Sequence, residues 1–99
     1  MTELVASVGD VGFALSLTVE PQADGSAWDF AGASAFIDVV RPHGTPATWT
    51  ATINGQVIEY ATQSGDLSIQ GIYRCRLRVT WGDGRVLRTP DRFLLEAKA

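Results

Sequence analysis

The feature that most constrains this chain is the alternation of side chains between residues 71 and 97. From Tyr73 to Trp81 every odd position is apolar or aromatic, and every even position is polar. This period of two is typical of a β-strand that buries one face and exposes the other. Beyond a turn signal at residues 82–84, further odd positions are apolar and predict a second long strand: Leu87, Phe93, Leu95 and Ala97.

The length of the loop decides how these two strands pair. A two-residue loop would place Arg88 opposite Val79 and direct a guanidinium group into the core. A three-residue loop, residues 82–84, places Leu87 opposite Val79 instead. Such loops usually close with a residue of positive φ, and Gly84 occupies that position. We therefore predict the three-residue loop, which sets Arg78 directly opposite Arg88 on the outer face.

A second hairpin is indicated by Asn54-Gly55, which lies between two β-like segments, ATWTATI and QVIEYAT. Asn-Gly between alternating apolar residues is the strongest short hairpin signal. A two-residue loop of Asn54 and Gly55 predicts that Trp49 lies opposite Tyr60. In the same register Ala51 lies opposite Ile58, so one face is apolar, and the other face carries Thr48, Thr50, Thr52 and Glu59.

The rest of the chain has the same β character. Residues 12–19 alternate, and Phe30 is expected to fill one end of the core. Residues 33–41 are strand-like but carry apolar side chains on both faces, so this strand is either covered on both sides or shows an apolar patch. Residues 2–9 are compatible with a short leading strand or with a loose arm, and the pattern does not decide between them. Strand-like segments about every ten residues, separated by turn signals, are typical of an antiparallel sandwich or barrel.

Length and composition set the limits of this interpretation. A chain of 99 residues is expected to form one domain, residues 1–99, with residues 1–10 as a possible N-terminal arm. The net charge of −3 and the pI of 4.9 argue against a nucleic-acid partner. The apolar run at residues 11–19 is too short to cross a bilayer, so no membrane partner is expected.

Candidate catalytic residues are few. His43 is the single histidine and lies in a Pro- and Gly-rich turn, without a nucleophile or orienting partner near it in sequence. Cys75 is the single cysteine; it cannot form an intrachain disulfide, and the alternation directs it into the core. No Cys/His cluster suits zinc, and the acids have no calcium-loop spacing. We expect a protein without enzymatic activity, metal or cofactor.

Four arginines are predicted to share the outer face of the C-terminal hairpin: Arg74, Arg76, Arg78 and Arg88. Like charges placed directly opposite each other destabilise a sheet, so these side chains need partners. In one interpretation, carboxylates of neighbouring strands, such as Glu59 or Asp38, lie between them. In the other, they meet an acidic partner, which could be the acidic first half of a second copy.

A possible apolar contact surface lies on the strand predicted at residues 33–41. Phe36 and Val40 fall on the face opposite Ala35, Ile37 and Val39, and Trp28 and Phe30, just upstream, are candidates to extend the patch. Outward apolar side chains that form a patch usually mark an interface, so self-association is expected. Trp28 is also the one tryptophan expected to be exposed. An alternative function is a small carbohydrate-binding or adhesin-type module, which would need two or three exposed aromatic residues on one face, and Trp28 is the one good candidate.

The segment from Asp66 to Cys75, DLSIQGIYRC, resembles the approach to strand F of immunoglobulin-like domains. In those domains a tyrosine two residues before a cysteine position returns its hydroxyl to upstream backbone, the tyrosine corner. The resemblance implies that Tyr73 is buried and bonded within residues 66–70. It also implies an immunoglobulin-like β-sandwich of about seven antiparallel strands.

Three segments in order, DFAGASAFIDVVRPHG, NGQVIEY and GDLSIQGIYRCRLRVTWGDGRVLRTP, resemble the N-terminal domain of phage baseplate upper proteins (BppU-like). The shared motifs are an Arg-Pro-polar-Gly turn, the Gly-x-Tyr strand that begins at Gly71, an Asp-Gly hairpin and a closing proline. The resemblance implies a stand-alone small virion protein of the tail, baseplate or neck. It would be made in the host cytoplasm and act by docking to other virion proteins.

Overall fold

A computed structural model describes residues 3–19, 22, 24–88 and 93–99 of the chain. Within these residues the protein is all-β, as predicted, and no helix is present that could cross a membrane. The strands are β1 (Glu3–Ser7), β2 (Ala14–Thr18), β3 (Ala33–Val40), β4 (Pro46–Asn54), β5 (Val57–Ala61), β6 (Gly71–Trp81), β7 (Val86–Arg88) and β8 (Phe93–Lys98).

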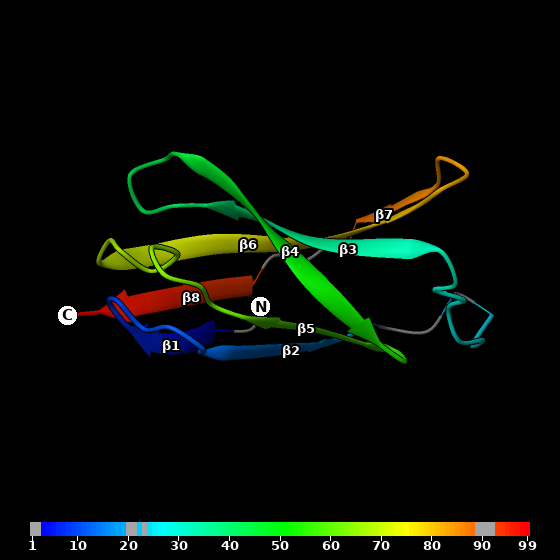
Figure 1. Ribbon diagram of the computed structural model, residues 1–99, viewed down its shortest axis with the longest axis horizontal. Helices are drawn as coiled ribbons and strands as arrows, with labels where there is room; N and C mark the ends of the chain where they lie inside the picture. The colour runs from blue at the N-terminus through cyan, green and yellow to red at the C-terminus, as the bar shows by residue number, and fades with distance from the viewer. Residues whose placement is uncertain (1–2, 20–21, 23, 89–92) are drawn as a thin grey trace.

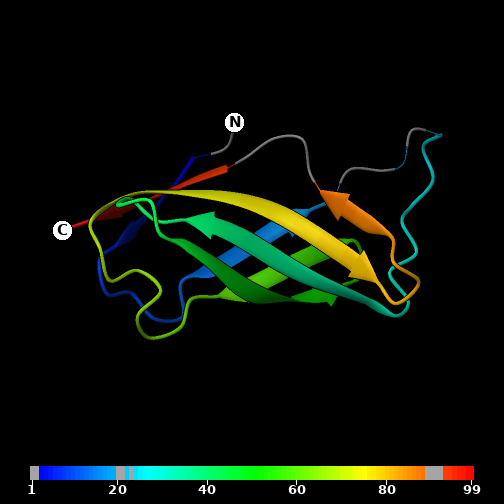
Figure 2. The same ribbon diagram turned by 90° about the horizontal axis from the view of Figure 1, so that it is seen from above.

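The strands form one mixed sheet in the order β1-β8-β6-β3-β4-β5-β2, with β7 also paired to β6. The sheet curls into a half-barrel, so that β2 and β5 pass beneath β6 and β3 (Figure 2). Strand β4 belongs to both halves and crosses the molecule diagonally (Figure 1). We call β1, β8, β6, β7, β3 and the start of β4 the large part of the sheet, and the end of β4, β5 and β2 the small part.

The prediction of a wholly antiparallel arrangement is wrong at one place, because β1 and β8 pair in parallel. The undecided segment at residues 2–9 contains this strand rather than a loose arm. Ala6 is buried, since β1 lies against β8 and directs alternate residues into the core. Two bonds hold the connection after β1 in place: Val8 N–H donates to the Lys98 carbonyl (2.8 Å), and Gly9 N–H donates to the Leu67 carbonyl (2.8 Å).

Strand β6 has the predicted alternation, and its odd residues from Tyr73 to Trp81 are all buried. The predicted three-residue loop is confirmed. Val79 lies opposite Leu87, the Trp81 N–H donates to the Arg85 carbonyl (3.0 Å), and Gly84 has a φ of 96°.

The single long strand predicted after this loop is divided into β7 and β8. Cys75 and Val79 are four positions apart on β6, whereas their partners, Phe93 and Leu87, are six positions apart. The β6–β7 and β6–β8 pairings therefore differ in register by two. Residues 89–92, which include the closing proline of the phage-like motif, lie outside the described residues. Because the two registers differ by an even number of residues, the apolar positions predicted for this segment stay on the core side.

The β4–β5 hairpin differs from its predicted register. Asn54 lies opposite Val57 and Ile53 opposite Ile58, so the loop is Gly55 and Gln56 rather than Asn54 and Gly55. Gly55 has a φ of 63°, and no residue other than glycine has a positive φ among those described. A type I′ turn on Asn54 and Gly55 would need positive φ at both, whereas a type II′ turn needs a glycine at its first position only.

The same hairpin opens beyond its first three residue pairs. The first part of β4, from Pro46 to Ala51, pairs with β3 instead of continuing along β5. Trp49 is therefore opposite Ile37 and not opposite Tyr60. The two aromatic rings still stack across the fold, with centroids 5.1 Å apart and planes inclined by 11°.

The core has two apolar clusters, one around Tyr73, Trp49 and Leu95 and the other around Trp81, Val79 and Ile58. Tyr73 is fully buried and forms the predicted corner. Its hydroxyl donates to the Ile69 carbonyl (2.9 Å) and accepts from the Ile69 N–H (3.1 Å). The connection between β5 and β6 is thereby held against the start of β6.

Gly71, predicted to be structural, begins β6 at a point of close approach. A Cβ atom added there would lie 2.7 Å from Pro42 Cβ, and the φ of Gly71 is 135°. Both observations exclude a side chain without a shift of the backbone. The glycine therefore lets the Arg41–Pro42 turn pack against the start of β6.

Candidate docking surface

The even-numbered residues of β6 point to the outer face of the large part of the sheet, because their odd-numbered neighbours are buried. Strand β3 lies alongside and contributes its own even-numbered residues to this face. We call the combined set the arginine face: Arg74, Arg76, Arg78 and Arg88 with Phe36, Asp38 and Val40. All seven residues come together by strand register, as the sequence pattern predicts for the arginines.

Arg78 has defined surroundings on the arginine face. Its Nε lies 3.0 Å from Asp38 Oδ2, and a terminal nitrogen lies 3.2 Å from Asp38 Oδ1, so the ion pair is bidentate. The same guanidinium lies over the Phe36 ring, 4.7 Å from its centroid. Both charged side chains remain partly exposed, so the pair contributes on the order of 1 kcal/mol or less to stability.

The interpretation that neighbouring carboxylates separate the arginines is confirmed for Asp38, which also lies directly opposite Arg76. It is wrong for Glu59. That residue lies on β5 in the small part of the sheet, where its carboxylate accepts a hydrogen bond from Asn54 Nδ2 (3.3 Å). The predicted juxtaposition of Arg78 and Arg88 is present, and both Arg88 and Arg74 are exposed.

The apolar members of this face differ from the predicted patch. Val40 is exposed, but Phe36 is half-buried because Arg78 lies over its ring. Exposed apolar side chains occur instead near Arg74. Ile72 on β6 and Val5 on β1 flank Glu96, with exposed fractions of 41% and 52%. The outer face therefore combines cationic and apolar side chains at the β1 end of the sheet.

Trp28 and Phe30 do not extend this patch, and the prediction that Phe30 fills one end of the core is confirmed. Their rings pack against Trp81, with centroid distances of 5.9 and 6.0 Å. Because Trp81 points to the core side of β6, both rings lie on that side and not on the arginine face. Trp28 is half-buried rather than exposed.

A side chain that the sequence did not single out holds Trp28 in place. Gln56 Nε2 donates to the Trp28 carbonyl (2.7 Å), and Gln56 Oε1 accepts from the Trp28 N–H (3.0 Å). Gln56 belongs to the β4–β5 loop, so this contact joins segments 28 residues apart in the chain. No local pattern marks such a pair, which explains why the sequence did not reveal it.

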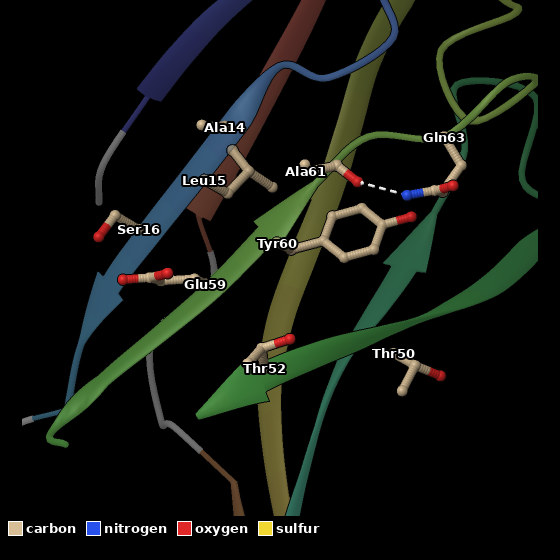
Figure 3. Close-up of a pocket in the computed structure, with 9 residues that line it drawn as sticks. All are labelled: Ala14, Leu15, Ser16, Thr50, Thr52, Glu59, Tyr60, Ala61 and Gln63. Carbon is tan, nitrogen blue, oxygen red and sulfur yellow. Dashed lines mark hydrogen bonds between the residues drawn. The ribbon is translucent and has the colours of Figure 1, made fainter. Parts of the chain in front are cut away.

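A polar hollow of about 570 Å³ opens on the small part of the sheet, where β4 leaves β5 (Figure 3). Hydroxyl, carboxylate and amide groups surround one aromatic ring there, and the side chains with polar groups are Ser16, Thr50, Thr52, Glu59, Tyr60 and Gln63. Gln63 Nε2 donates to the Ala61 carbonyl (3.1 Å) at one end of the hollow. The sequence did not predict this hollow, because it arises where β4 changes partner.

Tyr60 forms the aromatic part of the hollow and is held firmly. Its ring stacks on buried Trp49, and its hydroxyl donates to Asp66 Oδ2. The same carboxylate oxygen accepts from the Gln63 N–H (2.7 Å). Burial, followed by the hydrogen bond and the charge of Asp66, raises the pKa of Tyr60 well above its ordinary value of 10.0. The phenol is therefore a neutral donor at physiological pH.

Neither residue considered for catalysis is placed for it. Cys75 is fully buried, and burial raises the pKa of its thiol to about 12, so it remains protonated. His43 is exposed in its turn, with Nε2 2.9 Å from Thr45 Oγ1. The described part of the chain has no group of three or more His, Cys, Asp or Glu side chains that could hold a metal ion. Comparison with protein-family models and with curated proteins finds no match to this chain.

Proposed function

We propose that this protein is a non-catalytic docking module of a phage particle, a structural or adaptor protein of the tail, baseplate or neck. The arginine face is the observation that carries the docking role. Arg74 and Arg88 are exposed there, and Arg74 lies directly opposite exposed Val40, on a sheet whose other side is core. Arginine beside apolar side chains is typical of protein interfaces and suits an acidic partner surface.

The proposed fold in finer detail is an immunoglobulin-like sandwich. In such domains strand B pairs with strand E, and strands C, F and G are neighbours in the opposite sheet. Here β2 pairs with β5, and β3, β6 and β8 are neighbours in the large part of the sheet. The corner made by Tyr73, two residues before Cys75, supports the same assignment.

The virion role rests on the resemblance to phage baseplate upper proteins. The residues that carry it include the turn that begins at Arg41, the Gly-x-Tyr start of β6 and the Asp-Gly loop before β7. In this proposal the partners are other virion proteins or further copies of the chain, and not nucleic acid or membrane. The protein is made in the host cytoplasm and ends in the virion.

Mass spectrometry of purified particles, combined with chemical cross-linking, tests the role. The expected result is recovery of the chain in particles, with cross-links from the arginine face to an acidic neighbour. Absence from particles that assemble in cells expressing the chain would contradict the virion role.

Arginine reversal tests the surface. Arg74→Glu with Arg88→Glu should remove the chain from particles while leaving the melting temperature nearly unchanged, because exposed charges add little to stability. Arg78 is left intact because it pairs with Asp38. The matched control, Arg74→Lys with Arg88→Lys, keeps both charges and should be incorporated. Normal incorporation of the double-Glu variant would show that the arginines are only solvated.

The polar hollow favours a second candidate function, a carbohydrate-binding or adhesin-type module. Aromatic rings stack on sugars, and carboxylate, amide and hydroxyl groups bind sugar hydroxyls. Tyr60, Glu59 and Gln63 offer this combination. Titration of a set of neutral oligosaccharides, monitored by NMR shifts of the Tyr60 ring, tests it. Binding that Glu59→Ala and Gln63→Ala remove would favour this function over docking, and no shifts with any sugar would exclude it for that set.

A further inference from the structure

Strand β2 is the last strand of the sheet and has an open edge. It pairs with β5 on one side, and no described strand pairs with it on the other (Figure 1). Two bonds show which residues face β5: Thr62 N–H donates to the Phe13 carbonyl (3.0 Å), and Val19 N–H donates to the Gln56 carbonyl (3.1 Å). Both bonds follow the register of the β2–β5 pair. The residues that they involve on the β2 side, Phe13 and Val19, are odd-numbered, so the odd-numbered residues of β2 face β5.

In an antiparallel pair, successive residues direct their main-chain groups alternately toward and away from the partner strand. The N–H and C=O groups of Ala14, Ser16 and Thr18 therefore point to the open edge. All three residues are exposed, small and uncharged. An edge of this kind is a ready template for another strand.

Two of the other open edges, those of β4 and β7, carry features that discourage strand addition. The half of β4 that is free of β5 begins with Pro46, which lacks an N–H group. Strand β7 carries Arg88 and follows Arg85 directly. Proline and charge are the usual protections of edge strands, and β2 has neither between Ala14 and Thr18.

We propose that β2 pairs antiparallel with β2 of a second copy, about a two-fold axis at Ser16. The strand reads Ala-Leu-Ser-Leu-Thr, which is nearly symmetric about that serine. In this register Ser16 faces the partner's Ser16, and Ala14 faces the partner's Thr18. In this register even-numbered residues of one copy lie opposite even-numbered residues of the other. The outward N–H and C=O groups of the three residues can therefore bond to one another across the axis.

The side chains also suit this register. Leu15 and Leu17 of one copy meet Leu17 and Leu15 of the other on the core side, and no charge faces a like charge within the strand pair. Leu17 is half-buried in one copy, so the contact covers apolar surface that is otherwise accessible. The two small parts become one continuous sheet. The arginine face lies on the large part, so the dimer contact and the docking contact can be tested separately.

Sedimentation velocity over a concentration series tests the dimer directly. The unmodified protein should pass from monomer to dimer with a dissociation constant between about 1 μM and 1 mM, as expected of a small interface. A protein that stays monomeric up to about 1 mM overturns the proposal. The proposal would also be overturned if the unmodified protein were monomeric and its Ser16→Lys variant failed to enter particles. The edge of β2 would then bind a different virion protein.

Charge at position 16 tests the register. Ser16→Lys should raise the dissociation constant by about 100-fold or more, because two ammonium groups would face each other at the axis. Ser16→Glu should do the same, and an equimolar mixture of the two variants should form a heterodimer. Ser34→Lys, the same change at an exposed residue of β3, should dimerise normally. Dimerisation of Ser16→Lys alone would contradict the register.

A disulfide provides a test that does not depend on tolerance of charge. Hydrogen-bonded antiparallel pairs have Cα atoms about 5.5 Å apart, within the range that a disulfide spans. Ser16→Cys should therefore form a covalent dimer under mild oxidation, whereas Ser34→Cys should remain monomeric. Cys75 does not compete because it is fully buried. Failure of Ser16→Cys to cross-link at concentrations where the protein is dimeric would place the interface elsewhere.

Discussion

The two hairpins of this protein, β6–β7 and β4–β5, look alike in sequence but behave differently in the fold. Each has a short loop containing glycine, and each makes three residue pairs before its strands separate. Strand β6 keeps β3 as its other neighbour from Arg74 to Trp81, whereas β4 pairs with β3 first and with β5 only at its end. A turn signal therefore locates a reversal of the chain, but it does not say how far the two strands stay together.

The cost of a wrong register explains why one hairpin was predicted correctly and the other was not. In the β6–β7 hairpin, the alternative two-residue loop would bury Arg88, so the alternation excludes it. In the β4–β5 hairpin, the observed register differs from the predicted one by two residues, and the same side chains face the core in both. Hydrophobic pattern cannot separate registers that differ by an even number. The backbone requirement at Gly55 decides between them.

The largest expected effect compares the tryptophans of the two hairpins. Trp49→Ala and Trp81→Ala should each lower the free energy of unfolding by about 3–5 kcal/mol, the usual cost of truncating a buried aromatic residue. Only Trp81→Ala should also release the segment around Asp29, whose carbonyl accepts from Trp81 Nε1 (2.9 Å). Denaturant titrations measure the first effect, and hydrogen exchange at the Trp28 amide measures the second. Equal loss of protection in both variants would contradict the difference.

A smaller effect compares the tyrosines. Tyr73→Phe leaves both the N–H and the carbonyl of Ile69 without their partner in the core, so it should cost about 1–3 kcal/mol. Tyr60→Phe removes a hydroxyl from a half-buried site where Asp66 can bind water, so it should cost about 0.5–1.5 kcal/mol. Urea midpoints of both variants test this order. An unchanged midpoint for Tyr73→Phe would remove the corner from the account of stability.

The corrected turn in the β4–β5 hairpin predicts different costs at two adjacent positions. Gly55→Ala should cost about 1–2 kcal/mol, because an L-residue is strained at positive φ. Asn54→Ala should change the free energy of unfolding by no more than about 0.5 kcal/mol, because Asn54 is an exposed strand residue. Thermal unfolding of the two variants at equal concentration measures the difference. Equal costs would restore the Asn54-Gly55 turn.

The smallest effect concerns alkaline pH. Burial raises the pKa of Cys75 from 9.0 to about 12, so the unfolded chain releases this proton before the folded chain does. The folded state is therefore most stable below about pH 9, where the thiol is protonated in both states. Its free energy of unfolding then falls as the pH rises from about 9 toward 12. At about pH 9.5 the loss should be about 0.8 kcal/mol in the unmodified protein. In Cys75→Ala this contribution should be absent. Urea unfolding at pH values from about 8 to 9.5 compares the two slopes.

The sequence by itself determined the all-β class, the core face of β6, the three-residue loop before β7 and the common face of the four arginines. Each depends on side-chain parity or on the conformation of one turn, which are local properties of the chain. It also identified Asp38 as one of two possible partners for these arginines. The sequence could not choose between Asp38 and Glu59, because the partner depends on which strand lies beside β6.

The tertiary structure alone decided the features that depend on contacts between distant segments. These include the parallel pairing of β1 with β8, the division of β4 between β3 and β5, and the polar hollow that this division opens. It also placed Trp28 against Trp81 and the core. Periodicity shows which face of a strand is buried, but the neighbours of that strand are chosen by the packing of the whole chain.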